Sequence, residues 1–83
     1  MKTILITGGA GFIGSCFVEH IFRKYPDYRI VVLDLLTYAG EIENIHPDIR
    51  NSERFEFWYG GINNLDLVSD LTGKSDIVVH FAA

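Results

Sequence analysis

The sequence has few cysteines, few prolines and no long apolar run. One cysteine among 83 residues excludes an internal disulfide. The formal net charge of −4 and the lack of any Lys or Arg run argue against nucleic acid or an anionic membrane as the main partner. No segment approaches the roughly 18 apolar residues of a membrane span, and the N-terminus runs into an apolar, strand-like segment where a cleavable leader would begin. We therefore expect one cytoplasmic domain that binds a small molecule.

Metal chemistry is also not expected. None of the three histidines lies near Cys, Asp or Glu at the spacing of metal ligands. We interpret His20 and His46 as surface or packing residues, and His80 as a core histidine whose ring has a hydrogen-bond partner. Cys16 is expected to be a small buried residue on the apolar side of the first helix, in preference to a reactive thiol.

A glycine-rich stretch, Thr7–Ser15, is the main motif present. It reads T-G-G-A-G-F-I-G-S and directly follows the apolar run Ile4–Ile6. Gly8 permits a sharp turn out of a strand. Gly11 leaves room for a pyrophosphate at a helix start, where backbone N–H groups lack intrahelical partners, and Gly14 permits close packing of the helix on the strand. The pattern predicts a strand-to-helix turn that holds a phosphate; the alternative is a glycine-rich turn that binds nothing.

Hydrophobic periodicity predicts alternating strands and helices. We expect a helix from Phe12 to about Tyr25, one helical turn at residues 41–45 in a long connection, and a helix capped by Asn63 or Asn64, ended by Gly73, with Leu65, Val68 and Leu71 on its packed side. Strands are expected at residues 3–7, 28–33, 54–59 and 77–81, the third near a sheet edge. The order indicates an α/β fold, a Rossmann-type doubly wound parallel sheet of about four strands.

An aspartate follows the second expected strand. Asp34 lies twenty residues beyond Gly14, where an acidic side chain of a dinucleotide-binding fold accepts hydrogen bonds from the adenosine ribose. An aspartate that only caps a turn is the alternative. No Arg occurs among Leu35, Leu36 and Thr37 to receive a 2′-phosphate. These residues favour NAD over NADP as the cofactor.

Taken together, the glycine stretch, Asp34, the run Leu36-Thr37-Tyr38-Ala39-Gly40 and the ending His80-Phe81-Ala82-Ala83 resemble the extended short-chain dehydrogenase/reductases. Within them, the run after Asp34 is most typical of the nucleotide-sugar 4,6-dehydratases. Members of this family are about four times as long. The resemblance therefore implies that residues 1–83 are the N-terminal part of an NAD-binding Rossmann domain, with the substrate domain and the catalytic residues outside this chain.

The resemblance also implies which residues contact NAD. Phe12 and Ile13 would lie at the pyrophosphate and nicotinamide side, and Asp34 at the ribose. Two residues depart from the family pattern: Gly61 stands where an Asp commonly accepts from the adenine amino group, and Leu35 stands where a Lys is frequent. The implied cofactor-binding set is Gly8, Gly11, Phe12, Ile13, Gly14, Asp34, Leu35, Leu36, Thr37, Gly61, Ile62, Phe81, Ala82 and Ala83.

By the same resemblance, the full-length protein would be a homodimeric lyase that converts dTDP-glucose, or a related nucleotide sugar, to its 4-keto-6-deoxy product. In this family a Tyr and a Lys promote hydride transfer from sugar C4 to NAD⁺, an acidic pair removes water across C5 and C6, and the hydride returns to C6. None of these groups is identified in the 83 residues, so we expect the chain alone to be inactive. A non-catalytic nucleotide-binding remnant and a nucleotide-sugar epimerase of the same superfamily are the alternatives.

Overall fold

The computed structural model describes residues 1–35 and 42–81. Its centre is a parallel sheet of four strands in the order β3-β2-β1-β4, which confirms the predicted α/β fold. The strands are β1 (Lys2–Thr7), β2 (Tyr28–Asp34), β3 (Phe55–Tyr59) and β4 (Ile77–His80). The helices are α1 (Phe12–Lys24), the 3₁₀ turn η1 (Ile42–Asn44), α2 (Pro47–Arg50) and α3 (Leu65–Gly73).

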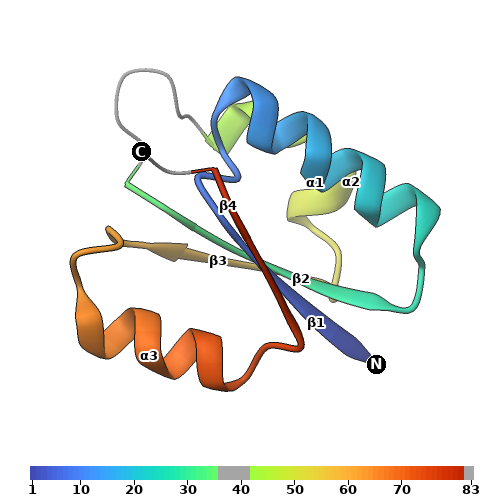
Figure 1. Cartoon of the computed structure of the whole chain (residues 1–83). Coiled ribbons are helices and arrows are strands. Elements are labelled where there is room, and N and C mark those ends of the chain that lie inside the picture. Colours follow the sequence, from blue (N-terminus) through green and yellow to red (C-terminus); the bar gives the residue numbers. More distant parts are fainter. Residues whose placement is uncertain (36–41, 82–83) are drawn as a thin grey trace.

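The helices cover both faces of the sheet. Figure 1 shows α1 and α2 on one face and α3 on the other. Alternate residues of a strand pack toward opposite helical layers, because successive side chains of a strand point to opposite faces of the sheet. Ile4, Ile6, Ile30 and Val32 join the core beneath α1, whereas Leu5, Val31 and Leu33 join Leu71 beneath α3.

The rotation of α1 about its axis differs from the prediction. Its buried residues are Gly14, Ser15, Val18 and Ile21, while Cys16 is exposed. Our expectation of a buried Cys16 was wrong. Since residues two apart lie about 200° apart around a helix, a helix that turns Gly14 and Val18 to the sheet turns Cys16 to the outside.

The connection between β2 and β3 contains a helix that the sequence analysis missed. A helical turn was expected at residues 41–45, and η1 lies within that range. Glu41 lies outside the described residues. The short helix α2 follows, with Pro47 at its start and the ring of His46 accepting from the backbone N–H of Asp48 at 3.2 Å. Ile45 and Ile49 of this segment are almost fully buried, so the segment contributes to the core on the α1 face.

Helix α3 begins as predicted, but one of its packed residues differs. The side chain of Asn64 accepts from the N–H of Leu67 at 3.2 Å, which is a normal N-cap. Leu65 is 74% exposed, and Leu67 joins Val68 and Leu71 against the sheet in its place. The cap at Asn64 sets where the helix starts, and Leu65 then lies about 200° away from Leu67.

Candidate functional site

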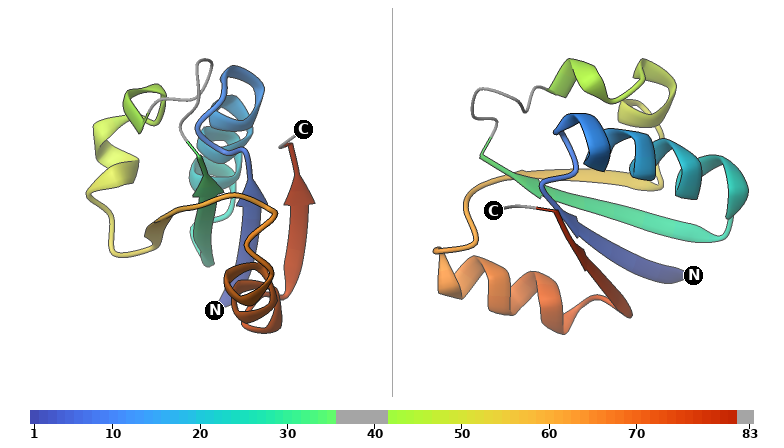
Figure 2. Two further views of the ribbon diagram at one scale, coloured as in Figure 1. Left: turned by 90° about the vertical axis from the view of Figure 1, so that its left-hand side faces the viewer. Right: turned by 45° about the horizontal axis from the view of Figure 1, so that its top comes forward.

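The carboxyl ends of the four parallel strands meet at one edge of the sheet, which we call the carboxyl edge. In the left view of Figure 2 the strands run upward to this edge, where the turn after β1 enters α1. The chain reverses its direction across the sheet between β1 and β4, because β1 is followed by β2 on one side and paired with β4 on the other. Ligands of open α/β sheets bind at such a switch point.

The glycines of the turn have the geometry that the motif predicts. Gly8 has φ 72°, a conformation that side chains rarely adopt. A Cβ on Gly14 would collide with the carbonyl oxygen of Gly8 and lie 2.9 Å from the Cα of Gly9, so α1 packs directly on the turn itself. The motif assigns no role to Gly9, yet a Cβ there would lie 2.8 Å from a methyl group of Val32. The lack of a side chain at Gly9 and Gly14 thus allows the turn to pack closely against β2 and α1.

The start of α1 is open to an anion. Its N-cap is Gly11, and among the described residues no side chain caps it and no acidic residue occupies the first turn. The first N–H groups of a helix have no intrahelical acceptor and lie at its positive end. Phe12 and Ile13, at this position, are 72% and 75% exposed. Among the described residues outside its chain neighbours, a Cβ on Gly11 would meet only the oxygen of Gly8 within 4 Å, at 3.5 Å, so these residues leave the approach to the N–H groups uncrowded.

The backbone of Ala10, between the glycines, is held on both sides. Asp34 accepts from the N–H of Ala10 at 2.8 Å through its Oδ2, and the side-chain amide of Asn44 donates to the carbonyl of Ala10 at 2.7 Å. The structure places Asp34 at the end of β2, as predicted, and beside the glycine turn; its contact with a ribose stays a prediction. Asn44 was missed, because the connection that contains it has no motif in the sequence.

On one side of this turn lie the residues expected near adenine. Gly61 is half-buried, and a Cβ added to it would lie 3.1 to 3.4 Å from the side chain of Leu35. The N–H of Gly60 donates to the carbonyl of Asp34 at 3.0 Å, which places the segment after β3 beside the end of β2. Ile62 is also half-buried here. Leu36 and Thr37 lie outside the described residues.

On the other side lie the ends of β1 and β4. The N–H of Phe81 donates to the carbonyl of Thr7 at 2.8 Å, and the ring of Phe81 packs against that of Phe17 with centroids 5.4 Å apart. His80 is exposed, so our assignment of it to the core was wrong, although its ring does have the expected partner: Nδ1 lies 2.6 Å from the hydroxyl of Thr7. Ala82 and Ala83 lie outside the described residues.

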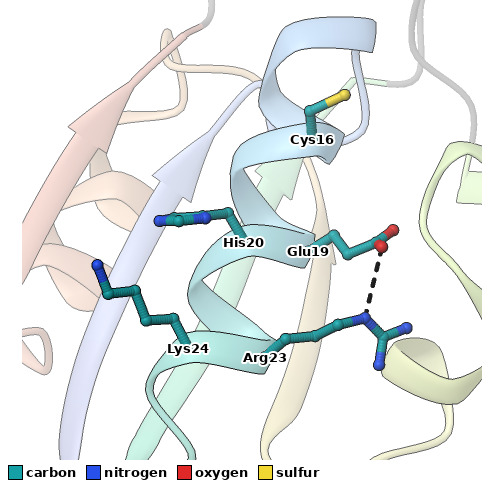
Figure 3. Close-up of a pocket in the computed structure, with 5 residues that line it drawn as sticks. All are labelled: Cys16, Glu19, His20, Arg23 and Lys24. Atoms are coloured by element: carbon teal, nitrogen blue, oxygen red, sulfur yellow. Dashed lines mark hydrogen bonds and ion pairs between the residues drawn. The ribbon is translucent and has the colours of Figure 1, made fainter.

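A hollow of about 550 Å³ lies on the outer face of α1 and is lined by Cys16, Glu19, His20, Arg23 and Lys24. Figure 3 shows these side chains along the helix, with Glu19 and Arg23 turned toward each other and paired at 3.4 Å. Within residues 1–35 and 42–81 no three potential ligands cluster as a metal site would require. No helix in that same part of the chain is long and apolar enough to cross a membrane.

The described site residues therefore fit a dinucleotide. They lie at or just after the carboxyl ends of β1, β2, β3 and β4, around a glycine turn whose helix start is uncapped by any described side chain. Such a turn binds a pyrophosphate through backbone N–H groups and the helix dipole. Asp34 lies on one flank of the turn and Phe81 on the other.

Comparison with known proteins gives one family and several close relatives. Residues 5–83 match the model of the GDP-mannose 4,6 dehydratase family. A dTDP-glucose 4,6-dehydratase of Mycobacterium tuberculosis is 49% identical over 80 residues, covering 96% of this chain and 23% of that protein. A trifunctional UDP-glucose 4,6-dehydratase, epimerase and reductase of Arabidopsis thaliana is 48% identical over 84 residues, covering 99% of this chain and 12% of that protein.

Solved structures resemble the fold closely. A dTDP-glucose 4,6-dehydratase from Bacillus anthracis in complex with NAD superposes with a TM-score of 0.90 at 39% identity, covering 100% of this chain and 27% of that one. A UDP-Glc/GlcNAc 4-epimerase of Campylobacter jejuni superposes with a TM-score of 0.82 at 35% identity, covering 100% of this chain and 25% of that one. This chain therefore spans about a quarter or less of the length of these relatives.

Proposed function

The chain belongs to the GDP-mannose 4,6 dehydratase family, and on that premise we propose that it is the NAD-binding part of a nucleotide-sugar 4,6-dehydratase. The full-length protein would convert dTDP-glucose to dTDP-4-keto-6-deoxyglucose, and the substrate domain would follow residues 1–83. The observation that carries the proposal is the glycine turn at the carboxyl edge, with Asp34 bound to its backbone at 2.8 Å and an uncrowded helix start.

The proposal assigns a role to each of the site residues. The N–H groups at the start of α1 would bind the pyrophosphate, because they lie at the positive end of the helix dipole. Asp34 would accept from the adenosine ribose while it holds Ala10, and its charge would repel a 2′-phosphate, which favours NAD over NADP. Leu35, Gly61 and Ile62 would border the adenine, with Leu36 and Thr37 assigned to the adenosine from sequence alone.

Phe12, Ile13 and Phe81 would border the nicotinamide side, together with Ala82 and Ala83. Bound NAD⁺ would supply the hydride chemistry, accepting hydride from sugar C4 and returning it to C6. The residues that move protons are expected beyond position 83, so the 83-residue chain alone should release no product. What this chain contributes is binding and orientation of the cofactor.

The likeness to dehydratases supports this reaction over epimerisation. The dehydratase complex with NAD superposes more closely than the epimerase of C. jejuni, with TM-scores of 0.90 and 0.82. The relatives act on both dTDP-glucose and UDP-glucose by their names, at 49% and 48% identity. We place dTDP-glucose first because the M. tuberculosis relative is named for the dehydratase reaction alone, whereas the A. thaliana relative is named for three reactions.

The test is an assay of the purified full-length protein with NAD⁺ and dTDP-glucose, UDP-glucose or GDP-mannose, followed by mass spectrometry for loss of water and by NMR, which distinguishes C4 epimers of equal mass. Loss of one water from dTDP-glucose, to give the 4-keto-6-deoxy sugar, is the expected result. Conversion of a nucleotide sugar to its C4 epimer without loss of water would replace the dehydratase with the epimerase. Binding of NAD⁺ with no turnover of any sugar would favour the non-catalytic remnant.

The same proposal includes the state of the full-length protein. We place it in the cytoplasm as a homodimer that binds neither nucleic acid nor membrane, in keeping with the net charge of −4 and with the family resemblance. Light scattering of the purified protein tests the dimer, and fractionation of cells tests the location.

A further inference from the structure

Asn44 reaches the glycine turn from a distant part of the chain. It is 34 residues from Ala10, and its Nδ2 donates to the carbonyl oxygen of Ala10 at 2.7 Å. That oxygen belongs to the same peptide group as the N–H of Gly11, which donates to the carbonyl of Gly8 at 3.2 Å. The peptide between Ala10 and Gly11 is therefore held at both of its polar ends.

This peptide determines how the start of α1 is presented. Gly11 is the N-cap, with φ −72° and ψ 175°, and the next N–H groups, those of Phe12 and Ile13, are the first of the helix. Glycine has no Cβ to restrict its backbone, so the turn needs an external anchor to keep its N–H groups in one direction. Asn44 supplies that anchor through a neutral amide, which adds no charge against an incoming phosphate.

The anchor itself is firmly seated. Asn44 is the last residue of η1, and the next residue, Ile45, is 1% exposed. The N–H of Ile45 donates to the carbonyl of Ile42 at 3.0 Å, and both Ile45 and Ile49 pack in the same core cluster as Ala10. The segment that carries the amide and the turn that receives it are thus parts of one packed unit.

We propose that Asn44 is a positioning residue for the cofactor pyrophosphate, acting through the peptide between Ala10 and Gly11. This role rests on the proposed binding of NAD. It differs from the role of Asp34, because Asp34 holds the preceding N–H and would also touch the ribose, whereas Asn44 holds the carbonyl of Ala10 on the side of the pyrophosphate.

The test compares Asn44→Ala, Asn44→Asp and the control Asn51→Ala in the full-length protein. Asn51 is the C-cap of α2, where its backbone N–H donates to the carbonyl of Pro47. It is a matched control because it has the same side-chain amide at a place away from the glycine turn. Calorimetric titrations would use NAD⁺ and adenosine, which lacks the pyrophosphate. We expect Asn44→Ala to weaken NAD⁺ about five- to tenfold, the equivalent of one hydrogen bond, and to leave adenosine within about twofold.

Asn44→Asp keeps the shape but cannot donate, so it should weaken NAD⁺ at least as much. Equal losses for NAD⁺ and adenosine, or no loss for either Asn44 variant, would overturn the role of Asn44. Failure of the unsubstituted protein to bind NAD⁺ would instead overturn the proposed function, and this role with it.

A second measurement does not depend on the cofactor. Amide hydrogen exchange of Gly11 and Phe12 in the ligand-free protein should be faster in Asn44→Ala and unchanged in Asn51→Ala, because only the first change releases the turn. Unchanged exchange in a folded Asn44→Ala variant would contradict the anchoring itself.

Discussion

The hydroxyl of Thr7 lies 2.6 Å from Nδ1 of His80, which joins the ends of β1 and β4 at the point where the sheet changes direction. Thr7 is buried and His80 is exposed, so the hydrogen bond links the interior of the sheet to its surface. Backbone pairing places the two residues opposite each other in the register of β1 and β4. The side chains therefore fasten the two strands at whose carboxyl ends we propose that NAD binds.

Replacing Thr7 with Val should destabilise the protein. The change keeps the shape and removes the hydroxyl, and we expect a loss of about 1 kcal/mol in the free energy of unfolding, the usual net value of one hydrogen bond. Urea denaturation of Thr7→Val, His80→Ala and the double variant gives the coupling between the two residues. Thr72→Val, at an exposed site on α3, is the control. A coupling near zero would mean that the hydrogen bond contributes nothing to stability.

Gly14→Ala should be severely destabilising. The added Cβ would meet backbone atoms of Gly8 and Gly9, which cannot move away as a flexible side chain could. We expect a loss of about 3 kcal/mol or more, at the upper end for overpacking. Gly73→Ala is the matched control in a helix, because nothing lies within 4 Å of the Cβ it would add, and it should raise stability by about 0.5 kcal/mol. Denaturation midpoints that moved equally for both variants would contradict the packing described for α1.

Arg54 should be needed as arginine at the end of α1. Its guanidinium donates to the carbonyls of Phe22, Tyr25 and Tyr28 at 2.9 to 3.1 Å and lies 4.0 Å from the ring centre of Phe22. A lysine ammonium cannot satisfy this planar arrangement, so Arg54→Lys should cost about 1 to 2 kcal/mol of stability.

The control for this change is Arg23→Lys, whose ion pair with Glu19 is half exposed and should be worth under about 0.5 kcal/mol. Chemical denaturation of both variants, followed by circular dichroism, measures the difference. If Arg54→Lys were as harmless as Arg23→Lys, the contacts at the end of α1 would be incidental.

Gly61→Asp should tighten the binding of NAD⁺ by the full-length protein. The family commonly has Asp at this position, where its carboxylate would accept from the adenine amino group. Gly61 does not have the positive φ found at Gly8, and the three atoms nearest to the new Cβ belong to the flexible side chain of Leu35, so the backbone can accept the change. One such partly exposed hydrogen bond is worth about 1.5 kcal/mol or less, roughly tenfold in the dissociation constant at most.

Calorimetric titration with NAD⁺ and with an analogue that lacks the adenine amino group measures this effect. The gain should be several-fold for NAD⁺ and absent for the analogue. Equal tightening for both ligands would show that adenine does not lie at Gly61.

The sequence by itself determined the fold, the glycine turn and the edge of the sheet at which Asp34 lies. Glycine spacing after an apolar strand predicted the turn, because the backbone of Gly8 at φ 72° is strained for other residues. The spacing to Asp34 predicted its place at the same edge, since parallel strands end together. The glycine turn depends on residues that are neighbours along the chain. The place of Asp34 depends on the pairing of two successive strands. Spacing in the sequence is enough to predict both.

Tertiary structure alone decided which way α1 faces and what anchors the turn. The periodicity of α1 allowed Cys16 to be buried or exposed, and the contact of Gly14 with the turn selected the exposed position. Asn44 and His80 find their partners 34 and 73 residues away, and a polar residue in a sequence does not show which residue its partner is. Those contacts exist only because β2, β4 and η1 pack around β1, so the physical cause lies in the assembled sheet.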